Sequence, residues 1–331
     1  MNNLLNKYYC IKRYLRNSAN DQKIYLEEKA KNIDKQIHFY NWWPHDSHSM
    51  WLSDFIEQRG ILKDKNKTIA FCSVFNEKEI LEYVDTDVRI FFSGENLHNS
   101  RHAQYADYML SGTAPYDLSL GFDLFDDERY LRFPLWLTYM FKPNATNEDI
   151  KLKCKQLRFP SVGKRDKFAT LIARADWNGI RTDIYNFLSK FGKVDCPSTL
   201  FHNDESLSSV FNDNKIEYLK QYSFNICPEN TNAYGYVTEK LFEAIEAGCI
   251  PIYWGSYNKP ELEILNQKAI LFWEKNNTND IMLNNITSML NSELELIKFA
   301  NQPRLVDNAE EIIINYFNNL ESKLRSILKN N

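Results

Sequence analysis

Residues 222–257 read YSFNICPENTNAYGYVTEKLFEAIEAGCIPIYWGSY, two short apolar runs separated by a polar loop and a helical pattern. The first run, Tyr222–Cys227, is rich in aromatic and β-branched residues and ends before a proline, which predicts a strand. Pro, Asn, Thr and Gly cluster over 228–235, as is typical of a loop. A helix is expected from Val237 and a second buried strand over Cys249–Trp254. This order predicts a βαβ unit of a parallel sheet.

The helix expected from Val237 begins beside a polar, aromatic loop. Its apolar positions share one face: Val237, Leu241, Ala244, Ile245 and Gly248. Gly248 also stands where a C-cap glycine is expected. In α/β proteins, a loop that leads into a helix N-terminus commonly binds phosphate groups. Because Lys240 adds a positive charge in the first turn, we expect this element to hold the anionic part of a ligand.

The same segment resembles the donor-binding signature of the α1,3-fucosyltransferases, glycosyltransferase family 10. The matching residues are Phe224–Asn225, Glu229–Asn230, Tyr234–Lys240 and Ile250–Ser256. Further pieces resemble the bacterial members in the same order: Asn41–Trp43, Arg89–Asn96, Gly121–Asp123 and Arg129–Leu135. The resemblance covers about Gln36 to Trp273, and the first 35 residues and the last helices lie outside it.

Strands alternate with helical patterns on both sides of a polar stretch, Asn144–Lys167, which is expected to be a linker. The expected strands are Gln36–Tyr40, Thr68–Phe75, Val88–Phe92, Phe168–Ala173, Val194–Cys196 and Ala269–Phe272. The expected helices are Ser49–Gln58, Glu77–Tyr83, Ile180–Phe191 and a helical region over Asn279–Lys329. Two successive α/β domains predict two Rossmann-like domains. The resemblance implies the same α/β fold, with the domains facing across a cleft (GT-B type).

The chain is divided on this basis into four parts. They are an N-terminal extension (1–35), an acceptor-binding domain (36–150), a donor-binding domain (160–275) and C-terminal helices (276–331). In the extension, Leu4, Leu5, Tyr8, Ile11 and Leu15 recur at helical spacing among basic residues. This pattern is typical of a helix that rests on an anionic membrane, but also of a solvated helix docked on the domain.

The composition limits the class of protein. A net charge of −4 over 331 residues argues against a nucleic-acid-binding protein, which would normally be basic. The six cysteines show no spacing of a zinc site or redox pair, which suits a reducing cytoplasm. The sequence has no apolar run of 18 residues and no signal-peptide pattern. We expect a cytoplasmic protein, with peripheral contact at the inner face of the membrane as the alternative for the extension.

Each candidate site residue has a functional and a structural interpretation. Glu95 follows a predicted strand, where α/β enzymes place catalytic groups, and the resemblance implies that it is the general base; otherwise it is a solvated loop residue. Arg181 opens a predicted helix, where a cation opposes the macrodipole unless an anion binds. The resemblance implies that Arg181 and Lys240 contact the donor diphosphate. The alternatives are a helix-surface arginine and a Lys240 paired with Glu243.

The resemblance implies three further contacts around the donor. Glu239 would bind hydroxyls of the donor sugar or ribose, although an acid is also favourable in a first helical turn. Tyr234, Tyr236 and Asn230 would line the donor loop, where Asn230 could instead be a turn former.

No metal site is expected. His98 and His102 could share a helix face, and His45 and His48 flank an aspartate, but no further ligand completes a zinc site. Asp85–Asp87 precedes a strand and is expected to be a turn. With two cations available for the diphosphate, no cofactor is required, although a divalent cation could stimulate the reaction.

The resemblance therefore implies an inverting transfer of L-fucose from GDP-fucose to N-acetylglucosamine in a β-galactoside, with α1,3 linkage and a Lewis-type product. The partners expected are GDP-fucose and an oligosaccharide or glycolipid acceptor. Two alternatives remain open: a transferase of the same fold that uses another nucleotide sugar, and a non-catalytic protein that binds sugars or nucleotides.

Overall fold

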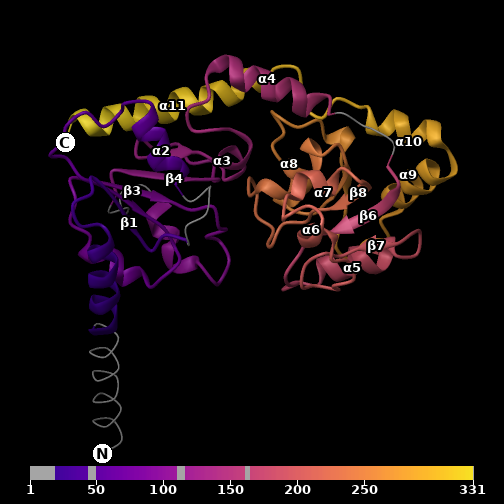
Figure 1. The fold of residues 1–331 in the computed structure, drawn as a ribbon, viewed down its shortest axis with the longest axis horizontal. Coiled ribbons are helices and arrows are strands. Elements are labelled where there is room, and N and C mark those ends of the chain that lie inside the picture. The colour runs from indigo at the N-terminus through magenta and orange to yellow at the C-terminus, as the bar shows by residue number, and fades with distance from the viewer. Residues whose placement is uncertain (1–18, 44–49, 110–115, 161–164, 331) are drawn as a thin grey trace, which may run out of the picture. The chain divides into compact units, whose positions relative to one another are not determined.

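The computed structural model describes residues 19–43, 50–109, 116–160 and 165–330. The chain forms two compact units (Figure 1). The first runs to Phe133 and also includes 318–331, and the second is Pro134–Phe317. The expected domain boundary near 150 therefore differs from this division. The helical pattern over residues 4–15, which suits either membrane contact or docking on the domain, lies outside the described residues, and residues 19–31 are helical.

The first unit contains a parallel sheet whose strands lie in chain order, β1-β2-β3-β4-β5. Its strands are β1 (Ile37–Tyr40), β2 (Ile69–Cys72), β3 (Val88–Phe92), β4 (Leu118–Gly121) and β5 (Tyr130–Arg132). Its helices include α2 (Trp51–Gln58), η1 (Lys78–Tyr83) and η2 (Ala103–Met109). The strands β1 to β3 were predicted to within a few residues. The helix expected over Glu77–Tyr83 is a 3₁₀-helix.

The second unit contains a parallel sheet in the order β10-β9-β8-β6-β7. Its strands are β6 (Lys167–Leu171), β7 (Val194–Asp195), β8 (Tyr222–Ile226), β9 (Ile250–Tyr253) and β10 (Leu271–Phe272). Since β7 and β8 lie on opposite sides of β6, the strand order reverses between β6 and β8. In open α/β sheets, ligands bind at such a switch point, outside the carboxyl ends of the strands.

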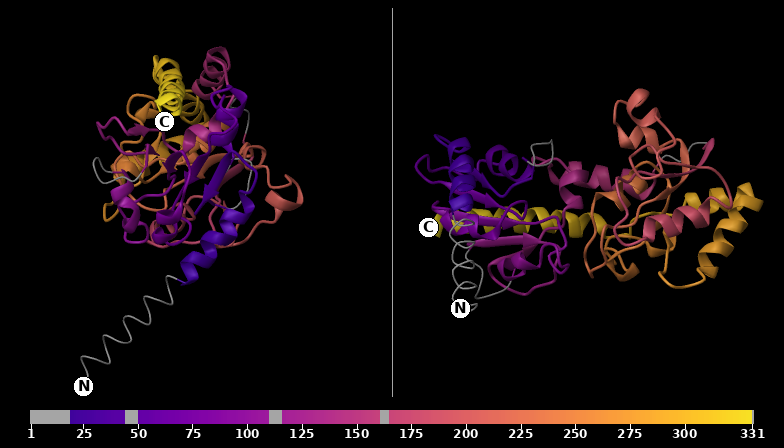
Figure 2. Two further views of the ribbon diagram at one scale, coloured as in Figure 1. Left: turned by 90° about the vertical axis from the view of Figure 1, so that its left-hand side faces the viewer. Right: turned by 90° about the horizontal axis from the view of Figure 1, so that it is seen from below.

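Helices precede, connect and follow the strands of the second unit. They are α3 (Trp136–Met140), α4 (Asn147–Arg158), α5 (Ile180–Leu188), α6 (Ser206–Ser209), α7 (Lys215–Leu219), α8 (Glu239–Glu246), η3 (Ser256–Asn258), η4 (Gln267–Ala269), α9 (Asp280–Asn291) and α10 (Glu293–Ala300). α9 and α10 pack side by side (Figures 1 and 2). The last helix, α11 (Ala309–Asn330), begins in the second unit and ends in the first.

Three sequence-based predictions about this region differ from the structure. The stretch expected to be a linker contains α4, whose capping box is formed by Thr146 and Asp149. The helical region predicted over Asn279–Lys329 is interrupted between α10 and α11. The strand expected over Ala269–Phe272 begins only at Leu271, because the residues before it form η4.

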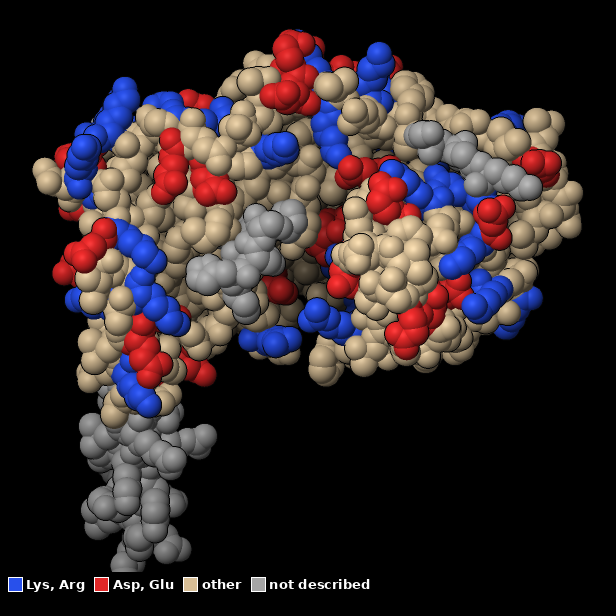
Figure 3. All heavy atoms as spheres, viewed as in Figure 1, with Lys and Arg blue, Asp and Glu red and all other residues tan. Residues whose placement is uncertain are grey.

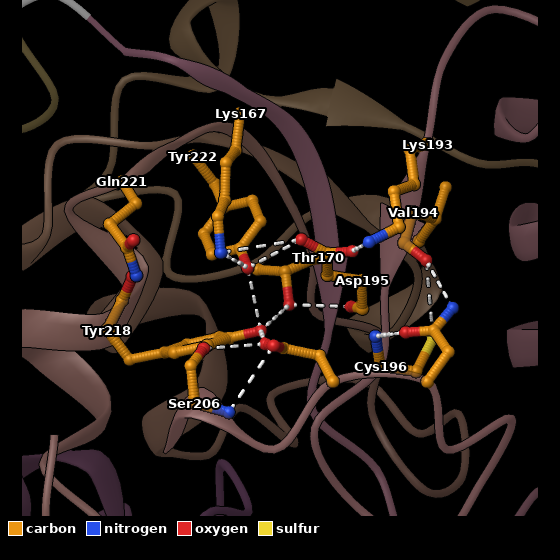
Figure 4. Close-up of polar contacts among 12 residues, drawn as sticks. Lys167, Thr170, Lys193, Val194, Asp195, Cys196, Ser206, Tyr218, Gln221 and Tyr222 are labelled. Carbon is orange, nitrogen blue, oxygen red and sulfur yellow. Dashed lines mark hydrogen bonds and ion pairs between the residues drawn. The ribbon is translucent and has the colours of Figure 1, made fainter. Parts of the chain in front are cut away.

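A buried polar network joins the strands β6, β7 and β8 to the helix α7 (Figure 4). The Tyr222 hydroxyl donates to Asp195 Oδ2 at 2.9 Å and lies 2.8 Å from the Tyr218 hydroxyl. Thr170 Oγ1 donates to the Asp195 carbonyl oxygen at 2.8 Å, and Lys167 Nζ donates to the Tyr222 hydroxyl at 3.0 Å. Burial is the main cause that raises the pKa of Tyr222, so this phenol stays protonated and can donate.

The surface carries both signs of charge. On the face shown in Figure 3, acidic and basic side chains are intermixed, and neither sign forms a continuous field.

Candidate functional site

The switch point of the second sheet brings Arg181 and Asn230 together. Arg181 lies in the first turn of α5, after β6, and Asn230 lies in the loop after β8. Arg181 Nη2 donates to Asn230 Oδ1 at 2.7 Å, and Arg181 Nη1 donates to the Ala175 carbonyl oxygen. Arg181 is only 8% exposed, so the alternative of a helix-surface arginine is wrong. Burial, opposed by Asp176 and Glu229, lowers the pKa of Arg181.

The loop that leads into α5 is fixed by its own polar side chains. Asp176 Oδ2 accepts hydrogen bonds from the Thr182 backbone N–H at 2.8 Å and from the Thr182 hydroxyl at 2.7 Å. Asn178 Nδ2 donates to the Asn230 carbonyl oxygen at 3.0 Å. Gly179 adopts a φ of +80°, a left-handed conformation that glycine adopts most readily. The loop after β6 and the loop after β8 therefore form one hydrogen-bonded unit around Arg181.

Lys240 lies in the first turn of α8, which begins at Glu239 rather than at Val237. Its Nζ donates to Thr238 Oγ1 at 2.8 Å and lies 3.5 Å from Glu229 Oε2 and 3.4 Å from Glu239 Oε1. Although burial acts to lower it, these two acids raise the pKa of Lys240, which stays charged. The pairing with Glu243 considered from the sequence is not the one observed.

Glu229 is a site residue whose role the sequence reasoning missed. It is 1% exposed and accepts hydrogen bonds from the Thr238 backbone N–H and hydroxyl, both at 2.7 Å. Burial is the main cause that raises its pKa, and Lys240 opposes that effect. The backbone of Gly255 passes so close that a Cβ there would lie 2.7 Å from Glu229 Cγ. The sequence gives one signal for this residue, the matching pair Glu229–Asn230, and that pair does not show that the Glu229 side chain is buried at the start of α8.

Glu239 and Lys240 line a small cavity of about 60 Å³ at the carboxyl ends of β6 and β8. Arg181, Lys215 and Glu243 also line it. Lys215 Nζ lies 3.3 Å from Glu243 Oε1 and was not predicted from the sequence. Although burial acts to raise it, Lys240 and Lys215 lower the pKa of Glu239, so this carboxylate stays ionised. The cavity thus combines three cations with carboxylates that can accept hydrogen bonds from hydroxyl groups.

The two tyrosines predicted to line the donor loop have different environments. Tyr234 is 47% exposed, whereas Tyr236 is 2% exposed and belongs to the core beneath the loop. Trp177, in the loop before α5, is 80% exposed and was not predicted. Of the two tyrosines, only Tyr234 presents its ring to solvent.

Glu95 lies in the first unit, in the turn that follows β3. Its backbone N–H donates to Ser93 Oγ at 3.0 Å, and the residue is half-buried. On the neighbouring strand, Asp123 stands at the equivalent position after β4, because Phe92 pairs with Leu120. His98 Nε2 lies 2.6 Å from Asp123 Oδ1. Glu95, His98 and Asp123 therefore all follow the carboxyl ends of two adjacent strands.

The other histidines and acids considered for a metal do not gather. His98 and His102 share no α-helix, and His102 is buried, which lowers its pKa. His45 and His48 lie outside the described residues. Asp87 accepts hydrogen bonds from the Thr68 N–H and hydroxyl, and the residues before β3 form an irregular segment with a bend at Asp87 rather than the predicted turn. Within the described part of the chain, no group of three or more His, Cys, Asp or Glu side chains could hold a metal ion.

Among the described residues, no helix is both long enough and apolar enough to span a bilayer.

Two family profiles match consecutive parts of the chain. Residues 37–139 match the alpha-(1,3)-fucosyltransferase FucT N-terminal domain. Residues 162–299 match the glycosyltransferase family 10 (fucosyltransferase) C-terminal region. The second match contains Arg181, Glu229 and the other residues described at the switch point, and the first contains Glu95.

Curated relatives are similar over part of their length. The alpha-(1,3)-fucosyltransferase FucT of Helicobacter pylori is 32% identical over 209 residues, which cover 54% of this chain and 39% of that protein. Alpha-(1,3)-fucosyltransferase B of Drosophila melanogaster is 27% identical over 208 residues, which cover 59% of this chain and 44% of that protein. The chain thus spans less than half the length of these two relatives.

Solved structures of an α1,3-fucosyltransferase share the fold. One, with GDP-fucose, has a TM-score of 0.52 at 22% identity and covers 86% of this chain and 89% of its own. Another has a TM-score of 0.55 at 23% identity, with the same coverage. The parallel sheets of both units thus agree with the GT-B fold expected from the sequence. By its two profile matches and its fold, the chain belongs to glycosyltransferase family 10.

Proposed function

We propose that the protein transfers L-fucose from GDP-fucose to a hydroxyl group of N-acetylglucosamine within a β-galactoside, with α1,3 linkage. The observation that carries the proposal is the cluster of Arg181, Lys240 and Glu239 at the switch point of the second sheet. Two cations beside a helix N-terminus suit a diphosphate, and an ionised carboxylate suits sugar hydroxyls. The relatives' names, α-1,3-fucosyltransferase, supply the sugar and the linkage.

The proposed reaction is a single displacement that inverts the anomeric carbon. Glu95 takes the proton of the acceptor hydroxyl, and that oxygen forms a bond to the anomeric carbon. The bond from this carbon to the diphosphate oxygen breaks, and its electron pair leaves with GDP. Arg181 and Lys240 stabilise the negative charge that develops on the leaving group, which is a large contribution in sites of this kind.

Donor binding is the first test. We expect GDP-fucose to bind more tightly than GDP-mannose or UDP-galactose in calorimetry. Lys240→Met should weaken GDP-fucose binding about ten- to hundredfold, since a hydrogen bond to a charged group is lost. Lys298→Met, at a largely exposed lysine (74% side-chain exposure), is the control. Equal affinity for all three donors would remove the fucosyl assignment and favour a transferase of another sugar.

Transfer is the second test. Glu95→Gln should lower kcat about 10²- to 10⁴-fold, the range that general bases contribute, while GDP-fucose affinity is unchanged. A variant with wild-type turnover would exclude Glu95 as the base. Nuclear magnetic resonance of the product distinguishes α1,3 from α1,4 linkage, and oligosaccharide and glycolipid acceptors can be compared in the same assay.

The two cations also allow the reaction to proceed without a metal ion. Because Arg181 and Lys240 offset the diphosphate charge, we expect transfer to persist in EDTA, with a divalent cation at most stimulating it. Loss of all turnover in EDTA, restored by a divalent cation, would contradict this proposal.

A further inference from the structure

The carboxyl edge of the first sheet carries an exposed aromatic surface. Trp42 and Trp43 follow β1 and stack with ring centroids 4.4 Å apart and planes at 14°. Trp43 also contacts Phe75, which follows β2, at 5.7 Å, and Phe92, the last residue of β3, at 5.7 Å. Phe75 is 43% exposed, and its N–H donates to the Asn41 carbonyl oxygen at 3.0 Å. The rings are thus held by the strand ends, and part of their surface is open to a ligand.

The same edge carries a polar pair two strands away from Phe75. Asp123 is 7% exposed, and its Oδ1 lies 2.6 Å from Nε2 of His98, whose side chain is 47% exposed. The second carboxylate oxygen, Oδ2, is buried and has no hydrogen-bond partner among the described residues. A buried, incompletely paired carboxylate costs free energy and is expected where it serves a function.

The pairing with Asp123 fixes the ring of His98. With the Nε2–H directed to the carboxylate, the other ring nitrogen is an acceptor for a hydroxyl group from outside. The His98 backbone N–H donates to Asn96 Oδ1 at 2.9 Å, and the ring lies edge-on to Phe122 at 5.8 Å. His98 is therefore an oriented, half-exposed hydrogen-bonding group.

Glu95 lies between these two features, because its strand, β3, lies between β2 and β4. Adjacent strands are about 4.8 Å apart, so the row from β1 to β4 extends about 14 Å. This length exceeds that of one sugar ring. Aromatic faces pack against the apolar faces of sugar rings, and imidazole nitrogens bond their hydroxyl groups.

We propose that this edge is the binding site for an acceptor of at least two sugar units. The ring that reacts lies at Glu95 with a hydroxyl bonded to His98, and the neighbouring ring stacks on the platform of Trp43 and Phe75. Asp123 is a positioning residue that orients His98. The inference rests on the proposed transfer reaction and adds to it the residues that select the acceptor.

The test compares two acceptors at saturating GDP-fucose: N-acetyllactosamine, with two rings, and N-acetylglucosamine, with one. Phe75→Ala should raise KM for the disaccharide about five- to tenfold and leave KM for the monosaccharide unchanged. His98→Gln should raise KM for both acceptors about tenfold, because it acts on the shared ring. The affinity for GDP, measured by calorimetry, should not change in either variant.

Matched controls come from the second unit. Phe159 is an exposed phenylalanine (60%), and His202, with 44% side-chain exposure, pairs with Glu205 at 2.9 Å as His98 pairs with Asp123. Phe159→Ala and His202→Gln should leave both KM values unchanged.

Three outcomes would contradict parts of this proposal. If the wild type transfers fucose and Phe75→Ala changes KM equally for both acceptors, or for neither, the second sugar ring does not stack on Trp43 and Phe75. If His98→Gln leaves both KM values unchanged, the hydrogen bond to the reacting ring is wrong. If the wild type transfers no fucose to either acceptor, the proposed function fails, and this inference fails with it. Unchanged GDP affinity shows that each variant is folded.

Discussion

At the scale of single residues, the loop between β8 and α8 depends on Glu229, an acid with no accessible surface on its side chain. It bonds Thr238 at the start of α8 and lies 3.5 Å from Lys240. We predict that Glu229→Gln lowers the free energy of unfolding by about 2–4 kcal/mol, because Lys240 loses one of its two acid partners while still largely buried. Urea denaturation measures the change.

Glu205→Gln is the control for that substitution. Glu205 has 79% side-chain exposure and pairs with the exposed His202, so its change should stay within about 0.5 kcal/mol. If both variants have the same stability as the wild type, Glu229 does not offset the charge of Lys240.

The close packing of Gly255 against Glu229 leads to a second prediction at this scale. A Cβ at this position would lie 2.7 Å from both Glu229 Cγ and Tyr253 Oη, and φ is +151°. Gly255→Ala should therefore cost about 2–4 kcal/mol, from overpacking together with backbone strain. Gly60→Ala is the matched control. Its φ is +55°, and a Cβ added there would have no atom within 4 Å, so only about 1 kcal/mol of backbone strain is expected. Equal losses in thermal melts would contradict the role of the contact with Glu229.

Most residues of the candidate site were named from the sequence, but their environments were not predicted. Arg181 and Asn230 meet as expected because each follows a strand beside the switch point. Tyr236 is buried and Tyr234 exposed, although both stand in the same motif. Which ring faces solvent depends on the path of the loop backbone, which residue type and spacing do not specify.

At the scale of elements, α5 depends on Asp176 before its first turn. Although burial acts to raise it, hydrogen bonds from Thr182 and the nearby Arg181 lower the pKa of Asp176. A depressed carboxyl pKa contributes stability above the unfolded-state value, near 3.9, and this contribution is lost as the pH falls through the folded value. Asp176→Ala should thus cost about 1 kcal/mol at pH 7, typical of a lost cap, and less near pH 3.

Urea denaturation of wild type and Asp176→Ala at both pH values measures this difference. Asp85→Ala serves as a control, since Asp85 is exposed, precedes a strand and caps no helix. A loss for Asp176→Ala that is the same at pH 7 and pH 3 would mean that the carboxylate charge does not stabilise α5.

The network of Figure 4 links three strands of the second sheet to α7. Tyr222→Phe removes the hydroxyl that donates to Asp195 and accepts from Lys167, so it should cost about 1–3 kcal/mol. Because Tyr218 and Tyr222 share a hydrogen bond, the double variant with Tyr218→Phe should cost less than the sum of the single variants. Strict additivity in urea denaturation would show that the two hydroxyls act independently.

Element types were predicted better than element ends. The helix α8 was recognised by its apolar face, but it begins at Glu239 because Thr238 is in an extended conformation and is held by Glu229. The polar sequence before β6 suggested a linker, yet Thr146 and Asp149 cap α4 there. Capping and long-range hydrogen bonds determine where these helices begin, and the periodicity of apolar residues carries no information about either.

At the scale of the whole molecule, the boundary between the two units lies where the helices begin to pack against the second sheet's helices, and not where the residue composition changes. Trp136, in α3, stacks on Phe242 of α8 at 4.0 Å and donates to Glu261 at 3.0 Å. These contacts join α3 to the second unit and explain why the boundary follows Phe133 and not residue 150. Sequence order alone cannot show that a helix packs against one 100 residues further along the chain.

The helix α11 belongs to both units, and this leads to a calorimetric prediction. Leu320 is buried in the part assigned to the first unit, and Ile313 is buried in the part assigned to the second. Each substitution by alanine should cost about 2–5 kcal/mol, as is usual for a buried aliphatic side chain. If GDP binds the second unit, it should raise only the unfolding transition of that unit. Ile313→Ala should then lower the GDP-sensitive transition, and Leu320→Ala should lower the other. A single transition lowered by both variants would show that the two units unfold together.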